Sequence, residues 1–259
     1  MGKPKNYFAT IKRNKRLEEG ISIVDIYVPG FRGDAEPGQF VMLKINSYYD
    51  PFLRRPYSIF ECNNEQIKIL VKSVGRASNL LVEKKQYEKI EIFGPLGTGF
   101  TLKNNYHPVL IAGGIGLAPL WFLAKRLKYH KQRFSFIFGE RTASQLGNNV
   151  LNSFGKYVTL TTDDGSRGFK GTVLSVLPHI IESIPHNDIA MYACGPVNML
   201  RNIVKLSKKS KIPAYISLEE RMACGIGVCL GCSVKKKGER AFMRVCKDGP
   251  VFNSEEVEI

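Results

Sequence analysis

The sequence lacks long apolar runs. None of its 259 residues lies in an uninterrupted apolar stretch of about 18 residues, the length that a membrane-spanning helix requires. The first residues, Met1 to Asn6, are polar and no apolar segment follows them, so we expect neither a signal peptide nor a membrane span. With 44% hydrophobic residues the composition is that of an ordinary globular chain, and we expect a cytoplasmic protein.

Histidine is scarce, and the sequence shows no set of side chains for covalent substrate chemistry. The four histidines are far apart, and none has the spacing of a site. No Ser/His/Asp arrangement or carboxylate pair typical of hydrolysis or proton transfer is evident. We therefore expect no catalytic residues in this chain, and we expect another polypeptide to carry out the substrate chemistry.

The charge balance is strongly basic, with 38 Lys and Arg against 23 Asp and Glu and a formal net charge of +15. Such a charge suits nucleic acid, an anionic membrane surface or an acidic protein. The lysines are spread over every segment, with short clusters only at 208–211 and 235–237, and no nucleic-acid-binding motif accompanies them. We expect a solvated basic surface and no nucleic-acid partner.

Four of the six cysteines lie near the end of the sequence. Cys224, Cys229 and Cys232 have the spacing C-x4-C-x2-C, and Cys246 follows them. Plant-type ferredoxins hold a 2Fe-2S cluster with this thiolate pattern. The intervening glycines are expected to form left-handed turns that bring backbone N–H groups toward the cluster sulfurs. These glycines are Gly225, Gly227 and Gly231.

The alternatives to an iron-sulfur cluster are a structural zinc site and a set of buried thiols. Zinc usually takes two pairs of ligands with short spacers, unlike this triplet plus one, so we favour a 2Fe-2S cluster held by the four cysteines. Cysteines that serve a metal agree with a reducing compartment. Cys62 and Cys194 are expected to remain thiols.

The first part of the chain, up to about Phe100, has the pattern of a small antiparallel β-barrel. The segments 21–28 and 40–45 are rich in apolar and β-branched residues, and turns with proline and glycine separate them. The segment 78–88 has apolar residues at helical spacing and predicts the one helix of this part.

Three motifs in the expected barrel together suit a flavin nucleotide. Arginine and lysine offer charge to a pyrophosphate, an aromatic ring offers a face to a flat ring, and serine offers a hydrogen bond to a ring nitrogen. Each motif alone could equally be a turn or a strand edge. The motifs are Arg54-Arg-Pro-Tyr-Ser58, Leu70-Val-Lys-Ser-Val-Gly-Arg-Ala-Ser-Asn79 and Gly94-Pro-Leu-Gly-Thr-Gly-Phe100.

From Pro108 onward, strands alternate with amphipathic helices. Residues 109–112 predict a buried strand, 113–116 a glycine turn and 119–130 a helix, whose first N–H groups and dipole favour a phosphate. The alternation predicts a Rossmann-like parallel sheet with a ligand crevice at the carboxyl ends of its strands. The further elements expected are strands at 134–138, 157–162 and 188–194, a helix at 197–207 and a last strand at 214–218.

We therefore expect a multidomain protein that combines α+β and α/β classes. Residues 1–101 would form an antiparallel β-barrel for a flavin nucleotide, residues 102–217 a parallel-sheet domain for a dinucleotide, and residues 218–259 a small 2Fe-2S module. Residues 234–245 of that module predict a hairpin with its tip near Lys237 and Gly238. The module is too small for a core of its own, so metal ligation must supply much of its folding energy.

The order of these motifs resembles the ferredoxin-reductase family of flavoproteins. The resemblance implies that Arg55 holds the phosphates of FAD, that Tyr57 packs on the isoalloxazine ring, and that Ser58 approaches its N5. Further FAD contacts are implied at Pro56, Leu70, Val71, Lys72, Gly75, Ala77 and Ser78, where Ala77 replaces a glycine that is common in the family.

The same resemblance implies NAD(P)H binding at the parallel sheet. The pyrophosphate would lie at Gly113, Gly114 and Gly116, and the nicotinamide near Cys194, Gly195 and Pro196. A small buried core residue is an equally good interpretation of Cys194.

The choice between NADH and NADPH depends on charge near the adenosine ribose. Asp163 and Asp164 would repel a 2′-phosphate, whereas Arg141 and Arg167 could pair with one. We favour NADH.

The cysteine segment itself resembles, almost residue for residue, the electron-transfer subunits of NAD-dependent, class 1B dihydroorotate dehydrogenases. The similar stretches are 217–232 and 245–252, and the motif order agrees over nearly the whole chain. The resemblance implies a catalytic partner subunit that carries FMN, oxidises dihydroorotate to orotate in pyrimidine biosynthesis, and passes electrons by way of the cluster and FAD to NAD+. It also implies a heterotetramer.

Two alternatives remain open. The first is a reductase subunit of a sulfhydrogenase or of an NADH-dependent ferredoxin:NADP oxidoreductase, in which one cluster ligand is often aspartate rather than cysteine. The second is a zinc-stabilised binding module that retains a reductase fold.

Overall fold

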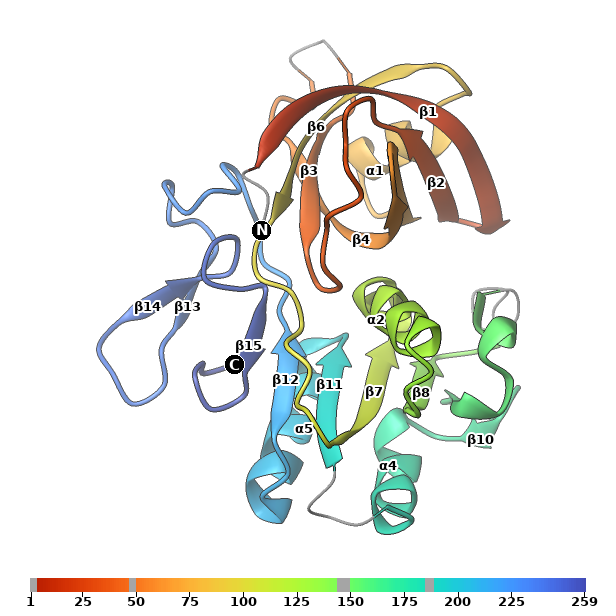
Figure 1. The fold of residues 1–259 in the computed structure, drawn as a ribbon, viewed down its shortest axis with the longest axis vertical. Coiled ribbons are helices and arrows are strands. Elements are labelled where there is room, and N and C mark those ends of the chain that lie inside the picture. Colours follow the sequence, from red (N-terminus) through yellow and green to blue (C-terminus); the bar gives the residue numbers. More distant parts are fainter. Residues whose placement is uncertain (1–3, 47–49, 144–149, 185–188) are drawn as a thin grey trace. The chain divides into compact units, whose positions relative to one another are not determined.

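The computed structural model describes residues 4–46, 50–143, 150–184 and 189–259, in which the chain forms two compact units (Figure 1). The first unit comprises Met1–Gly99, Glu219–Ser233 and Arg244–Pro250. The second comprises Phe100–Leu218, Val234–Met243 and Val251–Ile259. The predicted module 218–259 contributes segments to both units, and the division into three domains stays a prediction.

A closed antiparallel barrel, drawn in red to yellow in Figure 1, makes up most of the first unit, as the sequence predicts. Its strands follow the order β1-β2-β5-β4-β3-β6. Two register shifts in β1, after Ile11 and after Arg16, bend this long strand, which pairs with both β2 and β6. The strands are β1 (Lys5–Glu18), β2 (Ile21–Tyr27), β3 (Phe40–Lys44), β4 (Arg55–Asn63), β5 (Gln66–Lys72) and β6 (Lys89–Leu96).

The helix of this unit, α1 (Arg76–Glu83), begins and ends earlier than predicted. At its start the Ser78 hydroxyl accepts hydrogen bonds from the N–H groups of Val74 and Gly75, at 2.9 and 3.1 Å. At its end the Asn14 amide of β1 donates to the carbonyls of Leu81, Val82 and Lys84, at 3.1, 2.8 and 3.2 Å. Asn14 is distant in sequence, so the apolar spacing could not predict where the helix stops.

A seven-stranded sheet forms the second unit, in the order β10-β9-β8-β7-β11-β12-β15. Its neighbours are parallel except for β15, which runs antiparallel to β12. The prediction that 214–218 is the last strand of the sheet is therefore wrong, because the remote β15 pairs outside it. The strands are β7 (His107–Gly113), β8 (Ser135–Glu140), β9 (Val158–Thr162), β10 (Phe169–Lys170), β11 (Ile189–Cys194), β12 (Ala214–Ser217) and β15 (Val251–Asn253). Asp188, the predicted first residue of β11, lies outside the described residues.

The crossovers of this sheet reverse direction between β7 and β11. Helix α2 (Leu117–Tyr129) leads from β7 toward β8, whereas α4 (Val173–Glu182) and α5 (Val197–Ser210), which contact each other, lead toward β11 and β12. Right-handed crossovers that run in opposite directions place their helices on opposite faces, and the reversal is the point where such sheets bind ligands. The described part of the unit also contains the short 3-10 helices η1 (Gly114–Gly116) and η2 (Asn152–Tyr157).

The predicted hairpin of the C-terminal part is present. Strands β13 (Ser233–Lys235) and β14 (Phe242–Arg244) pair, and Gly238 between them has a left-handed φ of +76°. Across the described parts of the chain, no helix combines the length and the apolar character needed to cross a membrane.

Tyr192, on β11, is a fully buried polar anchor of the second unit. Its hydroxyl accepts a hydrogen bond from the Lys103 N–H at 3.0 Å and donates to the Thr101 carbonyl at 3.5 Å. Its ring stacks on Tyr215 with centroids 5.3 Å apart. Burial raises the pKa of Tyr192 to about 12, so the hydroxyl stays protonated and ties residues 101–103 to the sheet.

We predict that Tyr192→Phe lowers the free energy of unfolding by about 1–2 kcal/mol, because the buried Tyr192 hydroxyl no longer bonds to the Lys103 N–H and the Thr101 carbonyl. Chemical denaturation measures this change. Tyr215→Phe is the control, since the Tyr215 hydroxyl has no hydrogen bond within the described chain, and we expect a change near zero. Equal losses in both variants would contradict the assignment.

Candidate functional site

The four C-terminal cysteines come together as two pairs. Cys229 contacts the sulfur of Cys224 through its backbone N–H, and Cys246 contacts the sulfur of Cys232 in the same way. The second pair is buried, with 2% of each residue exposed, whereas Cys229 is exposed. Among the described residues, no group of three or more His, Cys, Asp and Glu is arranged to hold one metal ion.

Backbone N–H groups donate to three of the four sulfurs. The Cys224 sulfur accepts from Ile226 and from Cys229 at 3.5 Å, and the Cys246 sulfur accepts from Gly227 at 3.1 Å. The Cys232 sulfur accepts from the N–H of Cys246 at 3.4 Å. N–H donors favour the thiolate, the form in which cysteine binds iron.

Cys224 and Cys246 differ in how easily they lose a proton. Burial raises the pKa of Cys224, but the N–H groups of Cys229 and Ile226 outweigh it and lower the pKa to about 6. Burial, and then the neighbouring Cys232, raise the pKa of Cys246 to about 12. Cys224 therefore offers a thiolate at neutral pH, whereas Cys246 needs a bound metal to displace its proton.

Glycine allows the first cysteine turn to pack on the barrel. Gly225 has φ +71°, and a Cβ there would lie 2.8 Å from Cγ of Met42 on β3 and 3.2 Å from Cδ1 of Leu96 on β6. Gly227 is also left-handed, at φ +79°. The prediction is wrong for Gly231; its neighbour Leu230 takes the left-handed conformation instead, at φ +58°.

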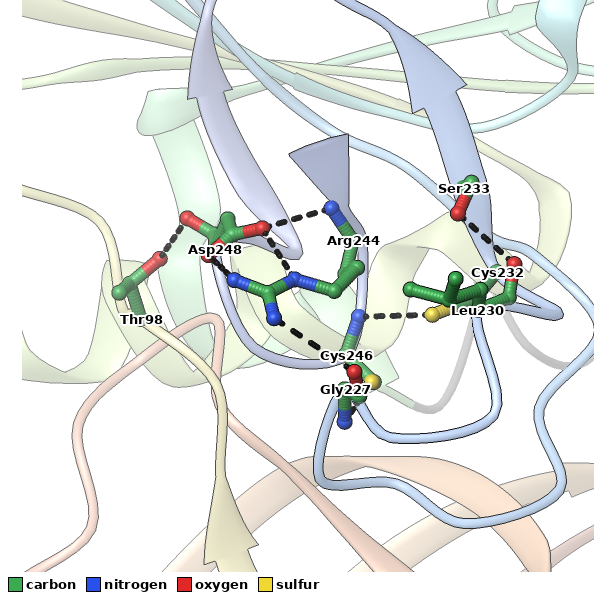
Figure 2. A network of polar contacts seen from close by, with 8 residues as sticks. All are labelled: Thr98, Gly227, Leu230, Cys232, Ser233, Arg244, Cys246 and Asp248. Carbon is green, nitrogen blue, oxygen red and sulfur yellow. Dashed lines mark hydrogen bonds and ion pairs between the residues drawn. The ribbon is translucent and has the colours of Figure 1, made fainter. Parts of the chain in front are cut away.

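The turn that carries Cys246 is fastened to the end of β6 (Figure 2). The Thr98 N–H donates to the Gly249 carbonyl at 2.6 Å, and the Thr98 hydroxyl donates to the Asp248 carbonyl at 3.5 Å. Asp248 in turn binds the Arg244 guanidinium through both carboxylate oxygens, at 2.9 Å each. Sequence reasoning placed Thr98 in a flavin motif. It did not predict that Thr98 meets the turn with Arg244 and Asp248, because nothing in the spacing of these residues shows the contact.

The arginine and tyrosine of the predicted flavin motif share one face of β4. Arg55 and Tyr57 are two residues apart, so both project from the same side of the strand, whereas Ser58 projects from the other. Burial raises the pKa of Tyr57 to about 12, and the nearby charge of Arg55 lowers it in part. The structure thus brings Arg55 and Tyr57 together and separates the Ser58 side chain from them.

The remaining predicted flavin residues are mostly buried. Leu70 and Val71 belong to the barrel core, and Lys72 at the end of β5 is exposed. Ala77 is buried, and the hydroxyl of Ser78 is engaged at the start of α1, where it also donates to the Gly75 carbonyl. Of this group, Lys72 and the backbone at Gly75, where a Cβ would meet open space, are left for a ligand.

An open hollow of about 360 Å³ joins the start of the flavin motif to the cysteine segment. Arg54 lines it, and the Nη1 of Arg54 is buried without a hydrogen-bond partner in the described structure, while its Nη2 pairs with Glu91 at 3.1 Å. The hollow was not predicted, since its residues come from four separate stretches of sequence. They are Asn6, Phe52, Leu53, Arg54, Phe93, Ala223 and Cys224.

The two predicted nucleotide loops meet at the reversal point of the parallel sheet. Gly116, in the loop after β7, packs directly against the loop after β11. A Cβ on Gly116 would lie 2.3 Å from the Cys194 carbonyl oxygen. A Cβ on Gly113 would lie 2.8 Å from Cδ of Pro196 and one on Gly195 3.0 Å from the Gly113 nitrogen. Gly114 has φ +53° and faces open space, which leaves its backbone accessible to a phosphate.

Cys194 itself is buried, with 1% exposed, and its role beside a nicotinamide stays a prediction.

The loop after β9 presents a fixed negative charge. The Asp164 carboxylate accepts hydrogen bonds from the N–H and hydroxyl of Ser166 at 2.9 and 2.6 Å, and these bonds lower the pKa of Asp164 to about 2. Ser166 also accepts from the Ala143 N–H at 2.7 Å, which ties this loop to the one after β8. Asp164 is therefore ionised at neutral pH, as the argument for NADH requires.

A six-stranded antiparallel barrel, a parallel sheet with glycine loops at its reversal point, and a cysteine segment define an electron-transfer oxidoreductase with the ferredoxin-reductase fold. Residues 219–258 match the model of the iron-sulfur cluster binding domain of dihydroorotate dehydrogenase B.

Curated relatives agree over almost the full length of the chain. It is 38% identical to the electron transfer subunit of dihydroorotate dehydrogenase B (NAD(+)) from Clostridium acetobutylicum, with 94% of this chain and 96% of that protein covered. It is 36% identical to the Clostridium perfringens subunit, with 96% of each covered. The chain belongs to the family of electron-transfer subunits of dihydroorotate dehydrogenase B.

Solved structures confirm the fold. A structure of the NADH-dependent reduced ferredoxin-NADP oxidoreductase, described for flavin-based electron bifurcation, matches with a TM-score of 0.83 and 27% identity, over 96% of this chain and 89% of that one. The ferredoxin reductase of carbazole 1,9a-dioxygenase matches with a TM-score of 0.70 at 20% identity, over 82% and 69% of the two chains.

We predict that Gly225→Ala lowers the iron content of the purified chain and its free energy of unfolding. The left-handed backbone costs any non-glycine residue roughly 1–2 kcal/mol, and the new Cβ also collides with Met42. Gly238→Ala is a matched control, because Gly238 has a similar φ of +76° and open space around it. It should lose stability but keep its iron. Equal iron loss in both variants would show that the contact of Gly225 with the barrel does not determine iron binding.

Proposed function

We propose that the chain carries electrons to NAD+ from an FMN-containing subunit that oxidises dihydroorotate to orotate, and that it holds a 2Fe-2S cluster and FAD for this purpose. The proposal is supported most directly by the two cysteine pairs with backbone N–H groups directed at their sulfurs. When bound, the cluster exchanges single electrons and the flavin exchanges either single electrons or a hydride.

The pairing of the cysteines suits two irons better than one. Each iron of a 2Fe-2S cluster takes two protein thiolates, and the pairs Cys224/Cys229 and Cys232/Cys246 supply two each. The N–H donors that already contact the sulfurs would stabilise the negative charge of a thiolate-bound cluster. The donor set therefore fits the group.

The barrel supplies what a flavin nucleotide needs. Arg55 offers a guanidinium to the phosphates, and Tyr57 on the same face of β4 offers a ring for stacking. Lys72 adds a second cation from β5, and Gly75 leaves its backbone open at the start of α1. In this proposal Ser58 approaches the flavin through its backbone, because its side chain lies on the other face.

The parallel sheet supplies the nicotinamide nucleotide site. Gly114 and the first turn of α2 present backbone N–H groups to a pyrophosphate at the reversal point of the sheet. The ionised Asp164 repels a 2′-phosphate, which favours NAD+ over NADP+.

We place the contact with the FMN subunit at the Cys224/Cys229 pair, of which Cys229 is exposed. Ile226, Val228 and Leu230 flank Cys229 and are themselves exposed, at 45%, 74% and 61%. Exposed apolar side chains that surround an electron carrier suit a protein contact that excludes water. We propose that two copies of each subunit assemble, in the cytoplasm.

The test is coexpression of the chain with a candidate FMN dehydrogenase subunit, scored as dihydroorotate-dependent reduction of NAD+. We predict that Cys229→Ser removes most of the cluster absorption, because one iron loses a ligand. The rate of dihydroorotate-dependent NAD+ reduction should fall at least about tenfold. Reduction of an artificial acceptor by NADH should survive in part, since it requires only the flavin and the nucleotide site.

Cys62→Ser, outside the cysteine segment, is the matched control and should keep both activities. Full cluster absorption and coupled turnover in Cys229→Ser would rule out the ligand assignment. If NAD+ reduction is coupled to a different dehydrogenase and never to dihydroorotate oxidation, the proposed partner is wrong.

We also predict that Arg55→Ala lowers the FAD content of the purified chain, because the phosphates lose their main cation. Arg54→Ala is the control, since Arg54 is the adjacent cation but precedes β4 and pairs with Glu91. Flavin absorbance after gel filtration measures the occupancy. An unchanged flavin content in Arg55→Ala would remove that residue from the phosphate site.

A further inference from the structure

Arg244 connects the two halves of the cysteine segment. It precedes Cys246 by two residues, and its Nη1 lies 3.5 Å from the carbonyl oxygen of Gly227, between the first two cysteines (Figure 2). The N–H of the same Gly227 donates to the Cys246 sulfur at 3.1 Å. The Arg244 guanidinium therefore connects the turn between Cys224 and Cys229 with the turn that carries Cys246.

Asp248 fixes the direction of the Arg244 side chain. Its two carboxylate oxygens accept from Nε and Nη2 of Arg244 at 2.9 Å each, a bidentate geometry that leaves the guanidinium a single orientation. The backbone N–H of Arg244 donates to the same carboxylate at 2.7 Å, and the Arg244 carbonyl accepts from the N–H groups of Lys247 and Asp248. The turn is closed around Cys246 on both sides.

The cation and the anion of this pair are not equivalent toward the sulfurs. Nη1 of Arg244 contacts the carbonyl of Gly227, whose N–H contacts the Cys246 sulfur, and the N–H of Cys246 contacts the Cys232 sulfur. The Asp248 carboxylate binds the guanidinium at Nε and Nη2. The positive end of the pair is therefore the end that is linked to the buried sulfurs. Both side chains are also partly shielded from solvent, with 31% and 24% exposed.

We propose that Arg244, oriented by Asp248, is a positioning residue that raises the reduction potential of the cluster at its buried Cys232/Cys246 end. This inference rests on the proposed iron-sulfur site. Reduction adds one negative charge, so a fixed cation beside two of the ligands stabilises the reduced cluster relative to the oxidised one. Asp248 attenuates that effect through its own opposite charge, while it holds the guanidinium in place.

The test is a reductive titration of the full-length purified chain, with the midpoint potential followed by electron paramagnetic resonance and iron content measured in parallel. Arg244→Gln removes the cation and should shift the potential to more negative values. Asp248→Asn removes the anion and should shift it to more positive values. Arg244→Lys keeps the charge without the bidentate fork, and its potential should stay close to that of the unmodified chain even if iron content falls.

The opposite signs separate an electrostatic role from a purely structural one. A structural clamp would lower iron retention in Arg244→Gln and Asp248→Asn alike and leave the potential of the remaining cluster unchanged, and that result would overturn the proposal. So would loss of the cluster from all three variants. If the unmodified chain itself shows no iron-sulfur signal, the proposed function fails; if it does and Arg244→Gln is unshifted, this inference alone fails.

Discussion

Backbone N–H groups directed at cysteine sulfurs are the interaction on which the rest of this structure depends. Thiols that lie in pairs would repel one another as thiolates, and a buried thiol such as Cys246 is costly to ionise because water is excluded from it. The N–H groups of Ile226, Gly227 and Cys246 offset part of that cost, because each donates a hydrogen bond to a cysteine sulfur. They reach the sulfurs because the backbone turns sharply at two left-handed glycines and at Leu230, and because the turn after Cys246 is held by Thr98 at the end of β6.

The second unit solves a similar problem without sulfur. A dinucleotide needs backbone donors in a crevice, and the sheet provides them where its crossovers reverse direction between β7 and β11. The close contact of Gly116 with the Cys194 carbonyl brings the two loops together, and Gly114 is left facing open space. In both units, then, backbone N–H groups are available to meet negative charge.

Sequence reasoning reached the parts of the molecule that are local. The barrel, the alternating strands and helices and the hairpin follow from periodicity and glycine placement over short stretches, and the family follows from the resemblance of local motifs to known proteins. What it missed depends on residues that are distant in sequence: Asn14 ends α1, β15 pairs outside β12, and Arg244 reaches Gly227. The sequence did not predict the full length of β1 either. Lysine and arginine are frequent in this strand, so apolar and polar residues do not alternate clearly along it. The roles of the flavin and nucleotide residues rest on resemblance and geometry, and remain predictions.

The three interlocked glycines at 113, 116 and 195 have a consequence for how this crevice can vary. Because a single methyl group at Gly116 would meet a carbonyl oxygen at 2.3 Å, the separation of the loops after β7 and β11 is set by the absence of side chains rather than by any bond between them. Neither loop can be remodelled alone. A change of coenzyme preference has to come from the outer loops, such as the one that carries Asp164, while the spacing at the centre stays as it is.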